Sequence, residues 1–169
     1  SRYESSGGAP PAPGAEVGGA ELRHVVAQDD FSSLWLTEPL EDSMGETCIR
    51  VIPAGVFNTR DARKRIRNEL AFWQRMRGDH VVNLYDYGWD HGYYYMLMRF
   101  MGTGSLEHLL ETDATAGITL PAFAVAFAEA LREVHGAAGA HGCLKPSNIF
   151  FDTPKHVRLS DFAIPLWLD

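Results

Sequence analysis

The sequence predicts an α+β protein whose first half is rich in strands and whose second half is mainly helical. Alternating apolar and polar residues recur in five short stretches between positions 22 and 100, which is typical of strands. A helix is expected after the third stretch, because Ala62, Ile66, Leu70 and Trp73 follow the helical period of about 3.6 residues. Two further helices and two short strands are expected to complete the order.

The five strands are expected within residues 22–28, 32–40, 46–55, 83–89 and 93–100, the last two as a hairpin around Asp90-His91-Gly92. The first helix is expected to begin at Asn58 or Thr59, which can cap it, and to end at Gly78. Later helices are expected at 105–111, with Ser105 as cap, and at 120–138, and short strands at 148–152 and 156–162.

Three segments differ in composition. Residues 1–20 are rich in Gly, Pro, Ala and Ser, and we predict a flexible linker or tail there. Residues 21–101 hold the five strands and the first helix, and residues 102–169 hold the rest. The apolar residues of the helix within 121–135 point in directions that one contact face does not cover, so we expect a protein partner or self-association through 121–135 and 164–169.

Charge and cysteine content exclude several classes of function. With 46% hydrophobic and 22% charged residues the composition is globular, and a net charge of −7 argues against nucleic-acid binding. The two cysteines, Cys48 and Cys143, lack metal-ligand spacing and suit a reducing compartment, so a cytoplasmic location is expected. No apolar run reaches the ~18 residues of a membrane span, so no membrane association is expected.

Basic residues are frequent on the first helix, at Arg60, Arg63, Lys64, Arg65 and Arg67. They could bind an acidic partner, but a solvated helix face is the favoured interpretation. Glu69 shares the inward stripe of this helix, so its carboxylate is expected to point towards the sheet.

Several motifs of the sequence resemble those of protein kinases, particularly those of the bacterial serine/threonine branch. HGCLKPSNIF at 141–150 resembles the catalytic loop HRDLKPxNIL, and SDFA at 160–163 resembles the DFG motif. CIRV at 48–51 lies where the family has VAIK, and Glu69 matches the helix glutamate that pairs with its lysine. The resemblance implies a kinase-like fold, with a small lobe of five antiparallel strands plus one helix and a partial, mainly helical large lobe that ends after DFA.

Departures from these motifs predict the loss of phosphoryl transfer. Cys143 stands where the resemblance implies the catalytic aspartate, Arg50 where it implies the phosphate-holding lysine, and Ala163 where it implies the glycine of DFG. In VAQDDFSSLWLT the three glycine positions of the phosphate-binding loop hold Ala27, Asp29 and Ser32. Asp29 and Asp30 place negative charge near the phosphate position, and they also suit a hairpin turn; both interpretations stay open.

Other polar positions of the nucleotide site persist. Asn148 and Asp161 match the two magnesium ligands, and Lys145 matches the loop lysine near the transferred phosphate. With Arg50 and Glu69 they would form a vestigial nucleotide site, although Asn148 and Asp161 also serve to hold the loop together. No cofactor is expected, and ATP with magnesium is expected to bind weakly at most.

We therefore predict a catalytically inactive pseudokinase that acts as a regulatory or protein-binding module, within a larger multidomain protein. One alternative is an atypical active serine/threonine kinase or nucleotide-transfer enzyme that uses Asn148 and Asp161 with a rerouted base. The other is a nucleotide sensor that binds ATP without turnover.

Overall fold

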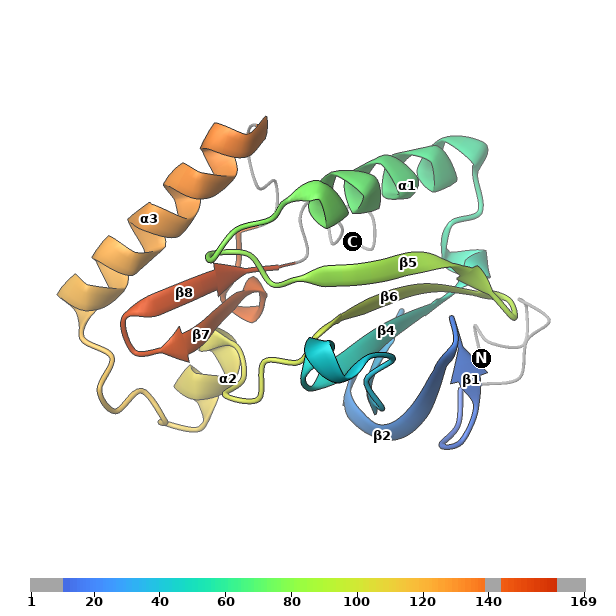
Figure 1. Cartoon of the computed structure of the whole chain (residues 1–169), viewed down its shortest axis with the longest axis horizontal. Helices are drawn as coiled ribbons and strands as arrows, with labels where there is room; N and C mark the ends of the chain where they lie inside the picture. Colours follow the sequence, from blue (N-terminus) through green and yellow to red (C-terminus); the bar gives the residue numbers. More distant parts are fainter. Residues whose placement is uncertain (1–10, 139–143, 161–169) are drawn as a thin grey trace. The chain divides into compact units, whose positions relative to one another are not determined.

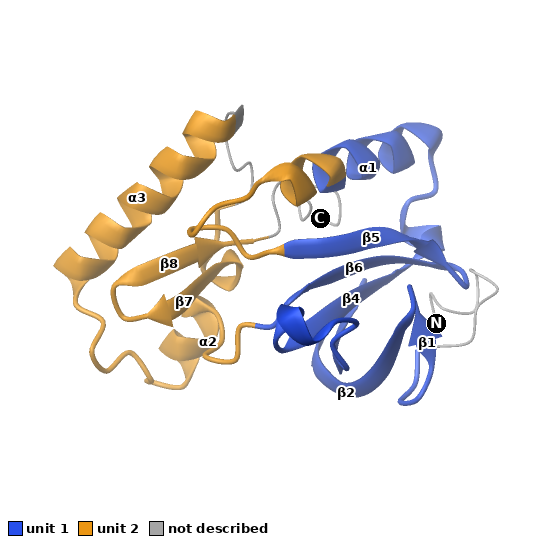
Figure 2. Cartoon of the chain, in the orientation of Figure 1, with its two compact units in different colours: residues 1–70, 84–100, 168 blue, residues 71–83, 101–167, 169 orange. Residues whose placement is uncertain are grey.

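The computed structural model describes residues 11–138 and 144–160, and the chain forms two compact units (Figures 1 and 2). Of the described residues, the first unit comprises 11–70 and 84–100. The second comprises residues 71–83, 101–138 and 144–160. Within the described part of the chain, no helix has the length and apolar content to cross a bilayer.

The first unit contains a six-stranded antiparallel sheet in the order β1-β2-β3-β4-β6-β5. Its strands are β1 (Glu16–Val17), β2 (Ala20–Gln28), β3 (Ser33–Thr37), β4 (Thr47–Pro53), β5 (Leu84–Asp90) and β6 (Tyr93–Arg99). Short 3₁₀ turns, η2 (Asp42–Met44) and η3 (Ala54–Val56), flank β4, and α1 (Arg60–Arg75) follows. The predicted cap of α1 is confirmed, since the hydroxyl of Thr59 accepts a hydrogen bond from the backbone N–H of Ala62 at 3.1 Å.

The N-terminal hairpin differs from the sequence prediction. The linker predicted for residues 1–20 is wrong for residues 16–20, because β1 pairs with β2 and adds a sixth strand to the five expected. Val17 and Ala20 are 3% and 1% exposed, so this segment contributes to the core. Val17 of β1 and Ala20 of β2 flank the Gly18-Gly19 turn. They adopt strand structure because a face of the sheet is available to bury them.

The sheet has two faces with different neighbours. Side chains alternate along a strand, so Ile49 and Val51 of β4 face one side with Trp35 and Leu97 in a buried cluster that also contains the N-terminal hairpin. Arg50 and its cross-strand neighbour Met96 lie on the other face. This second face also carries Tyr94, whose ring meets Phe57 edge-on at 5.2 Å, and α1 covers it (Figure 1).

Tyr95 connects the N-terminal hairpin to the sheet. Its hydroxyl donates a hydrogen bond to the carboxylate of Asp86 at 2.9 Å, and Asp90 accepts a hydrogen bond from the backbone N–H of Gly18 at 2.9 Å. Gly18 has a φ of +59°, and a Cβ added there would lie 2.5 Å from the ring of Tyr95. A larger residue at position 18 would therefore meet both backbone strain and a steric clash.

The second unit contains two helices and a hairpin. Its elements are α2 (Leu106–Glu111), α3 (Leu120–Ala138), η4 (Pro146–Asn148), β7 (Ile149–Thr153) and β8 (His156–Leu159), with β7 and β8 antiparallel. The predicted cap of α2 is confirmed, because the hydroxyl of Ser105 accepts from the N–H of His108 at 3.3 Å. The fold class predicted from the sequence, α+β with a strand-rich first part and a mainly helical second part, is observed.

Residues 71–83 belong to the second unit, whereas the sequence placed them with the first. The reason is a set of contacts that was not visible in the sequence. Val81 forms a parallel bridge with Leu159, and the guanidinium of Arg158 donates to the carbonyl of Val81 at 2.9 Å. Trp73 is fully buried and its indole N–H donates to the carbonyl of Val82 at 2.9 Å.

Helix α3 buries one face against the β7–β8 hairpin. Ala126 and Val134 are buried, Phe123 packs against Phe151 at 6.1 Å between ring centroids, and Val125 is 61% exposed. The expectation that not every apolar side chain of this helix faces inward is therefore correct. The predicted interface remains a prediction, and its second part, residues 164–169, lies outside the described residues.

Replacing Gly18 should destabilise the fold more than replacing its neighbour. We expect Gly18→Ala to cost about 1–3 kcal/mol more than Gly19→Ala in free energy of unfolding. Both positions have positive φ, but a Cβ at Gly19 meets no atom within 4 Å, so the difference isolates the overlap with Tyr95. Urea denaturation of the two variants measures it; equal losses would mean that the hairpin does not pack on Tyr95.

Tyr95 should make stability depend on pH in the alkaline range. Burial, then the hydrogen bond to Asp86 and the charges of Asp86 and Asp90, raise its pKa from 10.0 to about 12. Because the folded state favours the neutral phenol, this contribution is fully present below pH 10 and is lost as the pH rises towards 12. Between about pH 9 and about pH 11, Tyr95→Phe should therefore lose less free energy of unfolding than the wild type.

Urea unfolding at the two pH values measures this difference. Tyr87→Phe, which removes a hydroxyl from the other face of the sheet, is the matched control and should follow the wild type. If Tyr95→Phe also follows the wild type, the Tyr95–Asp86 hydrogen bond contributes nothing to the alkaline dependence.

Candidate functional site

The turn between β2 and β3 contains the positions at which the family resemblance implies a phosphate-binding loop. The carboxylate of Asp29 accepts hydrogen bonds from the backbone N–H groups of Phe31 and Ser32, both at 2.7 Å, and from the hydroxyl of Ser32 at 3.0 Å. A further bond joins the N–H of Asp29 to the carbonyl of Ser32 at 3.0 Å. The hairpin-turn interpretation of Asp29 is therefore confirmed: its side chain closes the turn on itself.

The hydrogen bonds of Asp29 within the β2–β3 turn disfavour phosphate binding there. A glycine-rich loop binds phosphate through backbone N–H groups that approach the anion without side chains in the way. Here two N–H groups of the turn already donate to a carboxylate of the same turn, and Ser32 is only 2% exposed. The neighbouring Asp30 adds an exposed negative charge.

Arg50 and Glu69 belong to the first unit and lie on the same side of its sheet. Arg50 is on β4 between Leu34 of β3 and Met96 of β6, is half-buried, and has a buried Nε. Glu69 is on α1 and is also half-buried. The family resemblance implies a pair between these two positions, but the ion pairs found among the described residues do not include one between Arg50 and Glu69.

Lys145 and Asn148 belong to the second unit. Lys145 is exposed, and its carbonyl accepts from the N–H of Asn148 at 2.9 Å within η4. Asn148 is 3% exposed, and its own carbonyl accepts from the N–H of Ser160 at 3.1 Å. These bonds join the end of the catalytic-loop motif to the end of β8, which agrees with a structural role for Asn148.

Three of the predicted positions, Cys143, Asp161 and Ala163, lie outside the described residues. Their proposed roles therefore stay predictions. Among the residues that are described, no cluster of His, Cys, Asp and Glu has the arrangement of a metal site.

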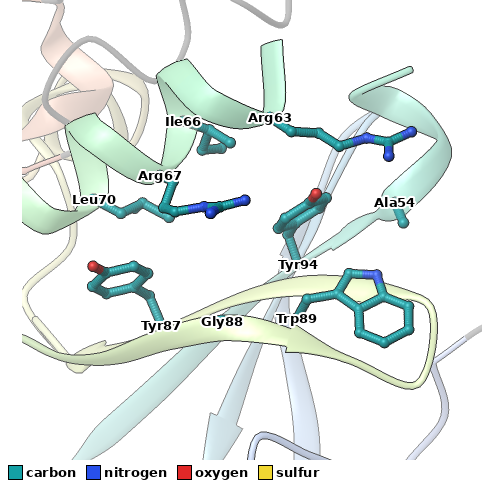
Figure 3. A pocket seen from close by; sticks show the side chains of 9 residues that line it. All are labelled: Ala54, Arg63, Ile66, Arg67, Leu70, Tyr87, Gly88, Trp89 and Tyr94. Atoms are coloured by element: carbon teal, nitrogen blue, oxygen red, sulfur yellow. The ribbon is translucent and has the colours of Figure 1, made fainter. Parts of the chain in front are cut away.

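A groove that the sequence did not predict lies between α1 and the β5–β6 hairpin, with a volume of about 650 Å³ (Figure 3). We call it the α1–β5 groove; its lining includes Arg63, Ile66, Arg67 and Leu70 of α1, and Tyr87 and Trp89 of β5. Two signals could have indicated it. Arg63 and Arg67 share the helix stripe of the buried Ile66 and Leu70, and aromatic residues alternate along β5.

Comparison with known families decides the classification. The family model described as "Protein kinase domain" matches residues 42–165, most of the chain. The chain belongs to the protein kinase family. Its matched region includes β4, α1, both strands of the β5–β6 hairpin and the catalytic-loop motif, so the resemblance of the motifs extends over both units.

Individual relatives are distant in sequence. The chain is 26% identical over 150 residues to the serine/threonine-protein kinase PknA of Corynebacterium glutamicum, covering 85% of this chain and 32% of that protein. It is 27% identical over 157 residues to PknE of Mycobacterium bovis, covering 89% and 27%. It is 26% identical over 119 residues to the mouse protein named inactive serine/threonine-protein kinase PLK5, covering 69% and 20%. The chain therefore spans about a third or less of these curated relatives.

Solved structures agree on the fold. The kinase domain of Mycobacterium tuberculosis PknI superposes with a TM-score of 0.71 at 19% sequence identity, covering 92% of this chain and 64% of that one. At this identity the match concerns the fold alone. It supports the kinase-like α+β architecture that the strand and helix order predicted.

Proposed function

We propose that this kinase-family domain is a pseudokinase: a binding or regulatory module that transfers no phosphate. The domain would act within a larger protein, since it spans only part of each relative described above. A reducing compartment such as the cytoplasm suits the cysteine content of the chain, and Cys48 is buried.

The observation that carries this proposal is the self-closed β2–β3 turn. Phosphoryl transfer depends on positioning and on neutralising the phosphate charge, and the turn offers neither. The Asp29 carboxylate competes for the N–H groups of Phe31 and Ser32 with the advantage of being covalently part of the turn. A nucleotide would have to displace it and tolerate two adjacent carboxylates at the same place.

Other positions support the same conclusion. Arg50 replaces an ammonium group by a bulkier planar guanidinium, which is not its equivalent at a phosphate. Cys143 replaces the aspartate that orients the substrate hydroxyl, and a thiol with a reference pKa of about 8.5 offers neither that geometry nor that charge. The name of PLK5 indicates that the wider family includes inactive members.

The residues described here do not fit ATP with magnesium. The N–H groups of the turn are occupied, and Asn148, one of the two positions that match magnesium ligands, is almost entirely buried. Lys145 is exposed, but one lysine does not compensate for these losses. We therefore expect no cofactor in this domain.

The first test of the proposal is nucleotide binding. A ligand at 100 times its dissociation constant stabilises a protein by about 2.7 kcal/mol, which raises Tm by several degrees. We expect millimolar ATP with magnesium to leave the Tm of this chain unchanged, while a kinase domain with intact motifs shifts in the same buffer. A clear rise in Tm would favour the nucleotide-sensor alternative.

The second test is catalysis. Because the turn, Arg50 and Cys143 each remove a different part of the machinery, restoring one part should not restore transfer. We expect Cys143→Asp to incorporate no radiolabelled phosphate into itself or a generic protein substrate beyond a heat-killed control. Incorporation by the single variant would mean that the turn tolerates a nucleotide; incorporation by the wild type would establish an atypical active kinase.

A further inference from the structure

One side of α1 carries a concentration of positive charge. With residues placed about 100° apart around the helix axis, four exposed cations fall within one arc of about 100°: Arg63, Arg67, Arg60 and Lys64. We call these four residues the cationic arc; it begins next to the buried Ile66 and ends on the outer side of the helix. Asp61, the only acidic residue between positions 60 and 68, falls on the other side of α1.

The charge of the cationic arc is not neutralised within the described residues. In 11–138 and 144–160, no carboxylate forms an ion pair with any of its four members. The Nε of Arg63 donates to the carbonyl of Phe57 at 2.9 Å, which orients the guanidinium and leaves its terminal nitrogens for another acceptor. The carboxylates of Asp86 and Asp90 on the neighbouring β5 lie on the opposite face of the sheet, where they bind Tyr95 and the N–H of Gly18.

An exposed tryptophan lies beside the cationic arc. Trp89 of β5 is 62% exposed and lines the α1–β5 groove together with Arg63 and Arg67 (Figure 3). The other two tryptophans of the described residues, Trp35 and Trp73, are only 6% and 0% exposed. An indole ring with its apolar body and polar N–H prefers the boundary between the headgroups and the hydrocarbon of a bilayer.

Cations next to an exposed indole ring favour a lipid surface over other anionic partners. The arc spans residues 60–67, about 10 Å along the helix, and it is convex, so it offers no cradle for a single anion. Anionic headgroups move freely in the plane of a bilayer and can gather beneath a convex surface. A nucleic acid would leave the indole ring without an apolar environment, whereas a bilayer interface accepts both groups.

The net charge of −7 does not prevent such binding. At an ionic strength of about 0.1 M the Debye length is about 10 Å, so only charges near the bilayer affect the affinity. Each Lys or Arg close to an anionic leaflet increases the affinity about fivefold. The four cations of the arc are therefore sufficient for weak, reversible binding, and the indole ring adds to it.

We propose that the cationic arc of α1 and Trp89 bind the surface of an anionic lipid bilayer, with the cations among the headgroups and the indole ring at their lower boundary. This inference goes beyond the binding module proposed above and does not depend on the loss of phosphate transfer. The sequence contains no run long enough for a membrane span, and we expected no membrane association on that ground. Binding at the bilayer surface requires no spanning segment, so the two properties are separate.

The test is co-sedimentation of the full 169-residue chain with vesicles of phosphatidylcholine alone or mixed equally with phosphatidylglycerol. We expect binding to the mixed vesicles only, and release when salt is raised from about 0.1 M to about 0.5 M. Lys64→Glu should weaken binding by about tenfold or more. Lys155→Glu makes the same charge change at another exposed lysine, in the β7–β8 turn, and should leave binding within about twofold.

A second measurement locates the tryptophan. Lipids brominated near the headgroup end of the acyl chain quench the fluorescence of an indole ring at the bilayer boundary. We expect quenching of the wild type on mixed vesicles and none of the Trp89→Phe variant, which keeps an aromatic ring and should bind within a few-fold of the wild type.

Four outcomes overturn the proposal. They are no dependence of binding on phosphatidylglycerol, equal effects of Lys64→Glu and Lys155→Glu in variants with unchanged melting curves, and quenching that persists in Trp89→Phe. The fourth is tighter binding of a soluble polyanion, inositol hexakisphosphate or single-stranded RNA, than of mixed vesicles, which would identify a polyanion site. None of these readouts involves ATP or phosphate transfer, so they separate failure of the lipid-binding surface from failure of the pseudokinase proposal.

Discussion

The alternation of side chains across β4, β6 and β5 is the constraint on which the rest of the first unit depends. It sends Ile49 and Val51 into a core that the N-terminal hairpin helps to cover, and it sends Arg50 towards the face that α1 covers. The same alternation places the carboxylates of Asp86 and Asp90 on one face of β5 and the rings of Tyr87 and Trp89 on the other. The buried core, the position of Arg50 and the α1–β5 groove thus all follow from one strand register. A register shift of one residue would move every side chain of the strand to the opposite face of the sheet.

If the domain is the pseudokinase proposed above, hydrogen-bond competition explains how its fold can lose phosphate binding and keep its structure. A backbone N–H has one proton, so an amide of the β2–β3 turn that donates to Asp29 is not available to phosphate. Asn148 still joins its loop to the end of β8 through backbone bonds, and Arg158 still holds Val81, and neither contact requires a nucleotide.

Local sequence predicted most elements, because their signals are local. The caps of α1 and α2 at Thr59 and Ser105 are Ser/Thr positions before a helical period, and both form the expected hydrogen bonds. The N-terminal hairpin was missed because Gly and Ala have little strand propensity of their own. Its pairing depends on Tyr95 and Asp90, more than 70 positions away in the chain.

For the candidate site, the sequence alone determined the family motifs. It also determined that Cys143 and Arg50 stand at the positions of the catalytic aspartate and lysine, because the identity of a side chain is read directly from the sequence. Only the tertiary structure shows that the Asp29 carboxylate closes the turn, because its contacts with three N–H and O–H donors depend on distances that the sequence does not give. It also decided that Arg63 and Arg67 lie beside the rings of β5, since a helix stripe and a strand face meet only after folding. Periodicity defines each surface separately; packing determines which surfaces meet.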